Sequence, residues 1–358
     1  MEKEVLLSVK NLQQYFKMGK RELKAVDNVS FDIYKGEVFG VVGESGCGKT
    51  TTGRSIIRLY DITGGSVYYK GERICAGTRS YKDTIKNAKA DLKAGKITKE
   101  ECEKIVNENR LEIKSAMADH KKWARQGGKN SLTNEIQMIF QDPIASLDPR
   151  MTVRDIIAEG LIIRGIKDKE YIDQQVYKIL ETVGLVQEHA SRYPHEFSGG
   201  QRQRIGIARA VIMNPELIIA DEPISALDVS IQAQVINLLN ELSEKMGLTI
   251  MFIAHDLAVV KYFSNRIAVM YFGKIVELGN SDELFAHPFH PYTRSLLSAI
   301  PLPDPITEKN RTRMTYNPML DHDYSKEQPT MREIYPGHFV LCNTEEFEKY
   351  KAEYESTK

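Results

Sequence analysis

The stretch from Gly43 to Thr50, GESGCGKT, constrains the fold of this chain more than any other, because it fits the phosphate-loop pattern G-x-x-x-x-G-K-[ST]. The glycines of such a loop let successive backbone N–H groups converge on phosphate oxygens, and the following helix adds the positive end of its dipole. Lys49 is expected to reach the β- and γ-phosphates of a nucleotide, and Thr50 to offer a hydroxyl to Mg²⁺. An apolar segment, EVFGVVG, precedes the loop, and a helix is expected from Lys49 to about Leu59. The loop therefore predicts an α/β nucleotide-binding fold.

A second stretch, FSGGQRQRIGIARA from Phe197 to Ala210, has the composition of another anion site. Ser198, Gly199 and Gly200 stand at the start of a predicted helix, where unpaired N–H groups and the helix dipole favour negative charge. The chain already has one complete phosphate loop, so this second site raises the question of which phosphate it would bind.

Polar side chains also end several apolar strands in the sequence. The predicted strand ELIIADEP includes Asp221, whose carboxylate can lie beside a Mg²⁺ ion, and Glu222, which follows on the opposite face. Glu222 is therefore well placed to orient or deprotonate a water that attacks the γ-phosphate. Gln141 follows QMIF and can reach the metal or the water, while His255 follows IMFIA and can donate to the γ-phosphate. Taken singly these residues mean little, but together they predict nucleotide hydrolysis.

Charge and composition limit the remaining possibilities. The 358 residues include 49 Lys and Arg and 49 Asp and Glu, and a net charge of zero argues against whole-surface attraction to nucleic acid. No apolar run approaches the roughly 18–20 residues of a membrane-spanning helix, and the start MEKEVLLSVK lacks a signal-peptide pattern. The cysteines Cys47, Cys75, Cys102 and Cys342 are scattered, so we expect no disulfide framework or metal site, and a reducing, cytoplasmic setting.

The pattern of elements suggests one α/β domain with an inserted segment. Strands are expected on either side of Gly19, and GSVYYKGERI is expected to form one further strand with a turn. Residues 75–135 hold 14 Lys or Arg and 9 Asp or Glu, and they predict a charged helical hairpin that turns at Ala94-Gly95-Lys96. Thr98 and Glu101 have the spacing of a capping box. Such charge-rich helices usually only face water, and docking of a partner is the alternative.

The later part of the chain returns to an ordinary globular composition. Residues 152–190 are expected to be mostly helical, and RQRIGIARAVIMN to form a helix that Pro215 ends. The segment NRIAVMYFGKIVELG predicts a β-hairpin. Beyond about Pro303 the sequence is rich in Pro, His, Asn and charge, so we expect a loosely structured tail.

In this order, the phosphate loop, Gln141, SGGQ, LIIADE and His255 resemble the ABC-type ATPases over about residues 5–300. In that family SGGQ is the signature motif, and two ATPase subunits pair head to tail. The resemblance implies that Ser198 and the N–H groups of the next two glycines cap the γ-phosphate held by the other subunit. The second anion site would thus serve a neighbour's nucleotide.

The resemblance also implies roles for individual residues. Asp228 of SALD would couple the two nucleotide sites, and Phe16 would stack on adenine, with Tyr15 as the alternative. Because none of the expected catalytic groups is replaced, an active ATPase that uses ATP and Mg²⁺ is implied. Its catalytic residues would be Glu222, His255, Gln141 and Lys49, and its metal site would comprise Thr50, Gln141 and Asp221. The implied nucleotide contacts are Phe16, Gly43, Glu44, Ser45, Gly46, Cys47, Gly48, Lys49, Thr50, Thr51, Gln141, Ser198, Gly199 and Gly200.

Three longer stretches narrow the resemblance to the ATPase subunits of oligopeptide and dipeptide importers, closer to the F type than to the D type. They are GESGCGKTTTGRSIIRLYDITGGSV, QDPIASLDPRMTV and the C-terminal HPFHPYTRSLLSAIPLPDP from His287 to Pro305. The implied partners are a second ATPase subunit of D type, two membrane permease subunits and, indirectly, an extracellular peptide-binding protein, with no nucleic acid. The implied location is peripheral, at the cytoplasmic face of the cell membrane.

Several alternatives remain open at this point. An importer of nickel or another small solute is the nearest one, and a soluble ABC ATPase that acts on a macromolecule is a more distant one, since fold alone does not fix function. The sequence also leaves open whether the ATPase pairs with a D-type partner or with itself. Some relatives have a cysteine-rich C-terminal segment, of which only Cys342 is present, so no iron–sulfur cluster is expected.

The expected fold is α/β, a P-loop NTPase of ABC ATPase type with an N-terminal antiparallel β-subdomain and a helical subdomain from about 142 to 214. The expected domains are an ABC ATPase domain over 5–285 and an oligopeptide-importer-type C-terminal extension and tail over 286–358. The helical insertion at 75–135 is longer than the family usually has at that place.

Overall fold

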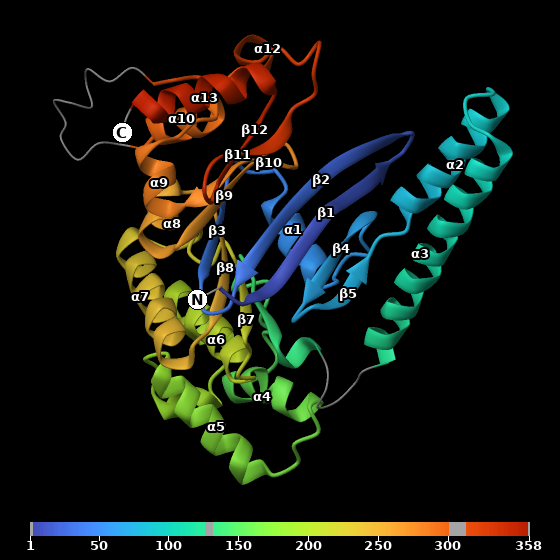
Figure 1. Cartoon of the computed structure of the whole chain (residues 1–358). Helices are drawn as coiled ribbons and strands as arrows, with labels where there is room; N and C mark the ends of the chain where they lie inside the picture. The colour runs from blue at the N-terminus through green and yellow to red at the C-terminus, as the bar shows by residue number, and fades with distance from the viewer. Residues whose placement is uncertain (1–2, 126–131, 301–312, 357–358) are drawn as a thin grey trace. The chain divides into compact units, whose positions relative to one another are not determined.

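The structure is a computed structural model that describes residues 3–125, 132–300 and 313–356. It divides into two compact units, each built from separate stretches of the chain (Figure 1). The first unit comprises Met1–Lys35, Thr50–Ile139 and Pro143–Ile218, and the second comprises Gly36–Lys49, Phe140–Asp142 and Ile219–Lys358. Two of the five passages of the chain between the units occur inside elements, namely helix α1 (Lys49–Ile56) and strand β7 (Leu217–Asp221).

The first unit contains an antiparallel sheet, a long helical hairpin and a group of shorter helices. Besides most of α1 and the start of β7, its elements are β1 (Val5–Met18), β2 (Arg21–Tyr34), β4 (Gly64–Tyr69), β5 (Glu72–Ala76), α2 (Arg79–Lys93), α3 (Lys99–Arg125), η2 (Leu132–Asn134), β6 (Ile136–Ile139), α4 (Val153–Ile163), α5 (Lys169–Thr182), η3 (Gln187–Ser191), η4 (Pro194–Glu196) and α6 (Gly199–Val211).

The sheet of the first unit has the strand order β2-β1-β4-β5, and all its neighbours are antiparallel. The expected strands on either side of Gly19 are confirmed as β1 and β2. The prediction of one strand for GSVYYKGERI is wrong, because the segment forms two paired strands, β4 and β5. Lys70 and Gly71 both have positive φ, 50° and 77°, so the chain reverses at this point, which glycine permits at little steric cost.

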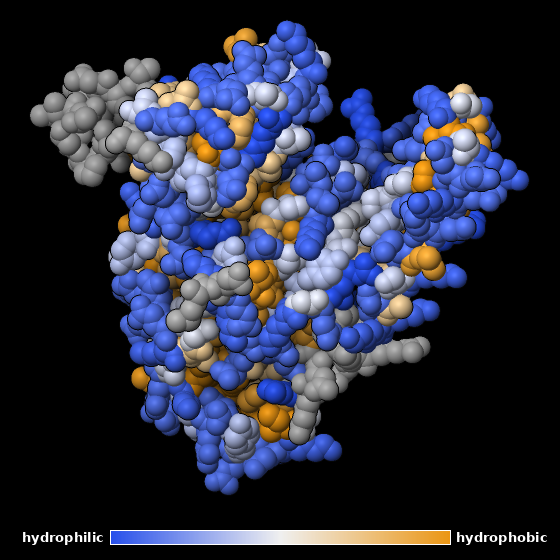
Figure 2. Space-filling model, viewed as in Figure 1, coloured by the Kyte–Doolittle hydropathy of each residue, from blue (hydrophilic) through white to orange (hydrophobic). Residues whose placement is uncertain are grey.

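Helices α2 and α3 form the expected charged hairpin. Gly95, with φ of 70°, lies in the turn, and the Thr98 N–H donates to the Glu101 carboxylate at 2.8 Å in the expected capping box. A small core that includes Ala88, Cys102 and Val106 joins the two helices. The face of the hairpin that Figure 2 shows is mostly hydrophilic. The hairpin therefore has only a narrow apolar contact of its own.

Caps and apolar faces explain the shorter helices of the first unit. Thr152 begins α4 by accepting from the Asp155 N–H, and Asp168 begins α5 by accepting from the Tyr171 N–H. Both helices bury apolar residues at helical spacing, such as Val153, Ile156, Ile157 and Leu161 of α4. The expected helices over 152–190 and at RQRIGIARAVIMN are confirmed.

The second unit is a layered α/β structure. Its elements are β3 (Val38–Val42), the end of β7, α7 (Val229–Met246), β8 (Thr249–Ala254), α8 (Leu257–Phe263), β9 (Arg266–Tyr271), β10 (Lys274–Asn280), α9 (Ser281–Ala286), α10 (Pro291–Ser298), α12 (Pro318–Asp321), β11 (Thr330–Tyr335), β12 (His338–Cys342) and α13 (Thr344–Ser356).

The strands of this unit follow the order β11-β12-β10-β9-β3-β8-β7. β3 lies in the middle and is parallel to both β8 and β9. Every residue of β3 and β8 is buried, as expected of parallel strands covered on both faces. Figure 1 shows α7, α8 and α9 along one side of these strands. A Cβ atom on Gly40 would lie 2.4 Å from Val260 Cγ1, so α8 packs directly against β3.

The C-terminal segment differs from its expectation. A loosely structured tail was expected beyond about Pro303, but residues 330–356 form β11, β12 and α13. β12 pairs with β10 and so extends the central sheet, and α13 covers the new strands with a core that includes Phe289, Val340 and Tyr350. The prediction was wrong because a few well-spaced apolar side chains outweigh a polar average composition. The first part of the expected tail, residues 303–312, lies outside the described residues.

Within the described ranges, no helix combines the length and the apolar character that crossing a membrane requires.

Candidate active site

The phosphate loop follows β3 and has a backbone that only glycine adopts easily. Gly43, Gly46 and Gly48 have φ of 155°, 81° and 109°. A Cβ atom on Gly43 would lie 2.1 Å from the Met270 carbonyl oxygen, so no side chain fits there. The Gly273 N–H donates to the Cys47 carbonyl at 2.8 Å and ties the loop to the turn between β9 and β10. The loop is thus a tight turn of the kind whose backbone N–H groups can converge on an anion.

Lys49, the first residue of α1, lies inside this turn. Its side chain is only 3% exposed, and its ammonium donates to the carbonyls of Gly43 at 2.7 Å and Glu44 at 2.9 Å. The same ammonium lies 3.9 Å from Glu222 Oε1. The loop therefore contains a buried cation within reach of the carboxylate expected to act on water.

Glu222 follows β7 and is the point at which the predicted catalytic groups meet. Gln141 Nε2 donates to Glu222 Oε2 at 2.8 Å, and His255 Nδ1 lies 3.7 Å from the same oxygen. The Glu222 backbone has φ of 44°, which is unusual for a residue with a side chain, and its N–H donates to the Ile253 carbonyl at 2.9 Å. Backbone strain of this kind costs about 1–3 kcal/mol and is often found at functional sites.

Asp221 and Glu222 differ in their surroundings. Asp221, the last residue of β7, is fully buried, whereas the Glu222 side chain is 12% exposed. Carboxylate, hydroxyl and amide oxygens are donors that Mg²⁺ prefers, so Asp221, Thr50 and Gln141 fit the expected metal by their chemistry. In the described residues, no group of three or more His, Cys, Asp and Glu side chains is arranged to hold a metal ion.

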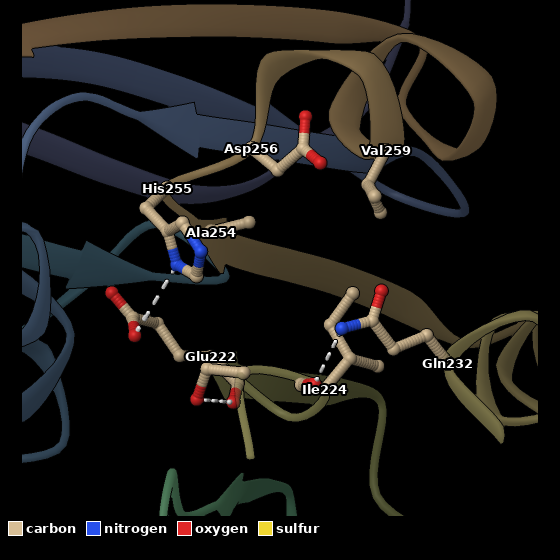
Figure 3. Close-up of a pocket in the computed structure, with 8 residues that line it drawn as sticks. Glu222, Ile224, Gln232, Ala254, His255, Asp256 and Val259 are labelled. Atoms are coloured by element: carbon tan, nitrogen blue, oxygen red, sulfur yellow. Dashed lines mark hydrogen bonds and ion pairs between the residues drawn. The ribbon is translucent and has the colours of Figure 1, made fainter. Parts of the chain in front are cut away.

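A small pocket of about 30 Å³ opens beside Glu222 and His255 (Figure 3). Ser225, Gln232 and Asp256 are among its other lining residues. A site that holds one water needs about 10–15 Å³ by the same measure, so this pocket has room for a water beside the Glu222 carboxylate. Ser225 Oγ donates to the Glu222 carbonyl at 3.1 Å and Gln232 to the Ile224 carbonyl at 3.2 Å, which fix the loop after β7.

The other predicted residues belong to the first unit and are described there. Ser198 is the cap of α6: its hydroxyl accepts from the Gln201 N–H at 3.3 Å, and Gly199 and Gly200 form the first turn. The Phe16 ring packs edge-on against Tyr60, with centroids 5.3 Å apart. The alternative, Tyr15, donates its hydroxyl to Asp27 at 2.5 Å, so its polar end is already engaged. Thr50 and Thr51 continue α1 after Lys49.

One contact of the phosphate loop was missed by sequence reasoning. The Glu44 N–H donates to the hydroxyl of Tyr292, in α10, at 3.0 Å. The two residues are 248 positions apart, and no spacing rule connects them. The only signal in the sequence was that Tyr292 belongs to the stretch HPFHPYTR, which resembles the C-terminal extension of peptide importers.

Comparison with family models agrees with this geometry. The model described as "ABC transporter" matches residues 26–130 and 103–225, which include the phosphate loop and the signature stretch. The chain belongs to the ABC transporter family. The model described as "Oligopeptide/dipeptide transporter, C-terminal region" matches residues 276–325. As a member of the ABC family with this cassette, the protein is an ATP-binding ATPase.

Several curated ABC proteins are similar over almost the whole chain. The oligopeptide transport ATP-binding protein OppF of Bacillus subtilis (strain 168) is 54% identical over 348 residues, which cover 97% of this chain and 99% of that protein. The dipeptide transport ATP-binding protein DppF of Lactococcus lactis subsp. cremoris (strain MG1363) is 48% identical over 354 residues, with 98% of each chain covered. Each of these similarities extends over nearly the full length of both chains.

Solved structures of ABC cassettes share the fold. One is the dimeric structure of a post-hydrolysis state of the ATP-binding cassette MJ0796 bound to ADP and Pi, with a TM-score of 0.57, 26% identity, and coverage of 77% of this chain and 99% of that one. CbiO1 from Clostridium perfringens, part of the ABC transporter complex cbiONQ, has a TM-score of 0.57 at 22% identity and covers 79% of this chain and 91% of its own. The expected ABC ATPase fold, with its antiparallel sheet and helical elements, is thus confirmed.

Proposed function

We propose that this protein is the ATP-hydrolysing subunit of an ABC importer that takes up oligopeptides or dipeptides through partner membrane subunits. The observation that supports it most is the similarity to peptide-transport ATP-binding proteins at 54% and 48% identity along nearly the full chain. The match of residues 276–325 to the peptide-transporter C-terminal region adds support beyond the shared ATPase core.

The proposed chemistry depends on the groups around Glu222. Its carboxylate orients or deprotonates the attacking water, and the adjoining pocket has room for that water. Lys49 and His255 stabilise the charge that develops on the γ-phosphate, and Gln141 links Glu222 to the end of β6. Bound Mg²⁺ would neutralise phosphate charge, with Thr50, Gln141 and Asp221 as the residues that would hold it.

The proposed assembly explains the second anion site. Two ATPase subunits pair head to tail, so that Ser198, Gly199 and Gly200 of one subunit cap the γ-phosphate in the other and Phe16 stacks on adenine. A solved relative that is a dimeric cassette supports the pairing. The second ATPase is proposed to be of D type, and the assembly to include two permease subunits and an extracellular peptide-binding protein. The protein would then lie peripherally at the cytoplasmic face of the cell membrane.

The proposed domain division follows the sequence expectation. The ABC ATPase domain covers 5–285, with the inserted hairpin at 75–135 and a helical subdomain at about 142–214, and the importer-type extension and tail cover 286–358. Helices α4, α5 and α6 supply most of the helical subdomain. The insertion is proposed to be a solvated segment, with partner docking as the alternative.

The deciding experiment is an ATPase assay of the purified chain, alone and with membranes that contain the candidate partner subunits, with and without short peptides and the binding protein. Hydrolysis that rises with peptide would support the peptide importer. Hydrolysis that rises with nickel or another solute would move the proposal to that cargo. Steady hydrolysis that ignores both membrane and solute would favour a soluble ABC ATPase instead.

A further inference from the structure

The C-terminal extension reaches the phosphate loop through one buried tyrosine. Tyr292 in α10 is 2% exposed, and its hydroxyl accepts the Glu44 N–H at 3.0 Å. The rings of Tyr271 and Tyr316 pack against it, with centroids 4.4 Å and 5.5 Å away. A buried phenol in an aromatic cluster has little rotational freedom, so its hydroxyl is a fixed hydrogen-bond partner for the loop.

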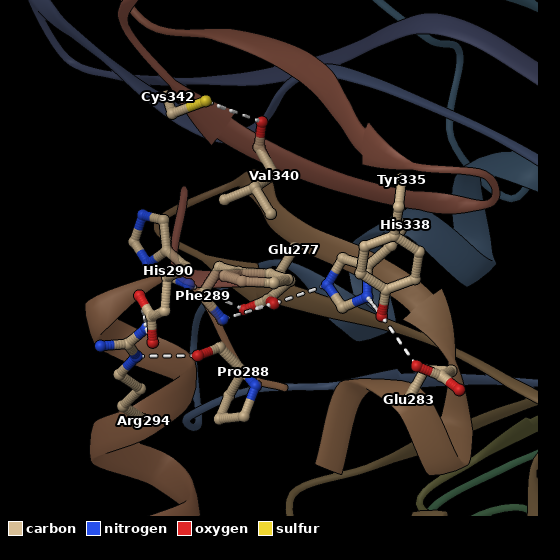
Figure 4. Close-up of polar contacts among 11 residues, drawn as sticks. Glu277, Glu283, Pro288, Phe289, His290, Arg294, Tyr335, His338, Val340 and Cys342 are labelled. Atoms are coloured by element: carbon tan, nitrogen blue, oxygen red, sulfur yellow. Dashed lines mark hydrogen bonds and ion pairs between the residues drawn. The ribbon is translucent and has the colours of Figure 1, made fainter. Parts of the chain in front are cut away.

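A chain of buried hydrogen bonds fixes Tyr292 in turn, and Figure 4 shows the part of it around Glu277 and His338. The Tyr292 N–H donates to His290 Nδ1 at 3.1 Å, which caps α10. The N–H groups of Phe289 and His290 donate to the two oxygens of Glu277, at 2.9 Å and 3.1 Å. His338 Nε2, from β12, lies 2.7 Å from the same carboxylate. Strand β12, the last strand in chain order, is therefore connected to the phosphate loop by consecutive polar contacts.

Glu44 is an effective place to hold the loop. Its carbonyl accepts from the Lys49 ammonium at 2.9 Å and from the Cys47 N–H at 3.3 Å, so its peptide groups join the start of the loop to the lysine that reaches the phosphates. A phosphate loop binds well only when its N–H groups already point to one centre. A loop that samples other conformations must be ordered during binding, which weakens the affinity.

We propose that Tyr292 is a positioning residue of the nucleotide site: its hydroxyl fixes the Glu44 amide and so keeps the phosphate loop in the conformation that binds ATP. The C-terminal extension is then part of the nucleotide site as well as an addition to the sheet. This inference depends on the ATPase activity alone and not on which solute is transported.

The test replaces Tyr292 by phenylalanine, which keeps the ring and removes only the hydroxyl. The matched control is Tyr316→Phe, which removes a hydroxyl from the same ring cluster without touching Glu44. For Tyr292→Phe we expect the Kd and the KM for ATP to rise about fivefold to tenfold, equivalent to about 1–1.4 kcal/mol, with kcat changed less than about twofold. Tyr316→Phe should leave Kd and KM within about twofold.

A second measurement does not depend on hydrolysis. Without nucleotide, hydrogen exchange at the Glu44 amide should speed up about tenfold or more in Tyr292→Phe and stay unchanged in Tyr316→Phe, because only the first variant loses the acceptor. Unchanged exchange and unchanged ATP affinity in Tyr292→Phe would overturn the proposal. So would equal losses in both variants, accompanied by equal drops in melting temperature, because these would show a general packing role.

Discussion

The inserted hairpin α2–α3 and the C-terminal extension α10–α13 are attached to the cassette in opposite ways. At the hairpin base Arg73 reaches Asp119 at 2.7 Å and Glu112 at 3.4 Å, and Lys122 reaches Glu72 at 2.7 Å, mostly through exposed groups. The extension is held by Glu277 and His338, whose side chains are 0% and 1% exposed. Solvent-exposed polar contacts contribute little to the free energy of unfolding, whereas breaking a buried ion pair lowers it strongly. The extension should therefore be coupled to the site, and the hairpin should not.

The largest expected difference is in kcat, between a glutamate replaced at the candidate site and one replaced on the exposed hairpin. Glu222→Gln should keep ATP binding and lower kcat by about 10³-fold, because the amide cannot take a proton from the water. The same change at the exposed Glu103 of α3 should leave kcat unaltered. Steady-state hydrolysis and ATP binding measured on both variants check this. Normal turnover in Glu222→Gln would rule out Glu222 as the base.

The next largest effect is expected where the extension joins the sheet. His338→Ala removes the imidazole partner of the buried Glu277 carboxylate, leaving its two backbone N–H donors, and should lower the free energy of unfolding by about 3 kcal/mol. Urea denaturation of this variant and of His338→Gln, which retains an N–H donor, provides the measurement. We expect a clearly smaller decrease in the free energy of unfolding for the glutamine variant. A loss below about 1 kcal/mol in the alanine variant would mean that the buried contact does not anchor the extension.

The extension should also respond to acid. Burial, with His322 and Arg294 nearby, lowers the pKa of His290 to about 3. In the unfolded chain this imidazole has its ordinary pKa near 6.5, so below pH 6.5 the unfolded state binds more protons than the folded state. The free energy of unfolding therefore decreases as the pH falls, by up to about 1.4 kcal/mol per pH unit. Urea denaturation between pH 6.5 and 5 should show this slope, and His290→Asn, which can still cap α10, should show less of it. An identical slope in both proteins would assign it to other groups.

The smallest effect is expected at the hairpin. Arg73→Ala should lower the free energy of unfolding by about 1 kcal/mol and leave kcat unchanged, because its partners Asp119 and Glu112 are 30% and 51% exposed and can be solvated once Arg73 is gone. Limited proteolysis should nevertheless cut α2–α3 faster, since fewer contacts join it to β5. A change in the rate of ATP hydrolysis in this variant would show that the hairpin is coupled to the site, contrary to the expected difference between hairpin and extension.

The sequence predicts the hairpin better than the extension for a physical reason. The hairpin is stabilised by local signals, namely the turn at Gly95 and the capping box at Thr98, and both are visible within a few residues. The extension depends on β12 pairing with β10 and on Glu277 meeting His338, which are 61 positions apart. Contacts at such separation leave no periodic trace, so the composition suggested a loose tail.

The candidate site could be predicted where its residues come soon after a predicted strand in the sequence. Gln141, Glu222 and His255 each follow an apolar run, Lys49 belongs to the loop that follows another, and parallel strands bring their ends together. The structure places these four within the second unit. The positive φ of Glu222 and the contact between Tyr292 and Glu44 could not be predicted, because both depend on how distant backbones pack.

The chain passes between the two units five times, at 35/36, 49/50, 139/140, 142/143 and 218/219. No single contiguous fragment therefore contains either unit complete and alone, and no single cut in the gene can separate them. Replacing one whole unit by a homologous one would therefore require several exchanges of DNA. The hairpin enters and leaves within one uninterrupted stretch, 79–125, and is therefore a part that recombination could lengthen, shorten or remove.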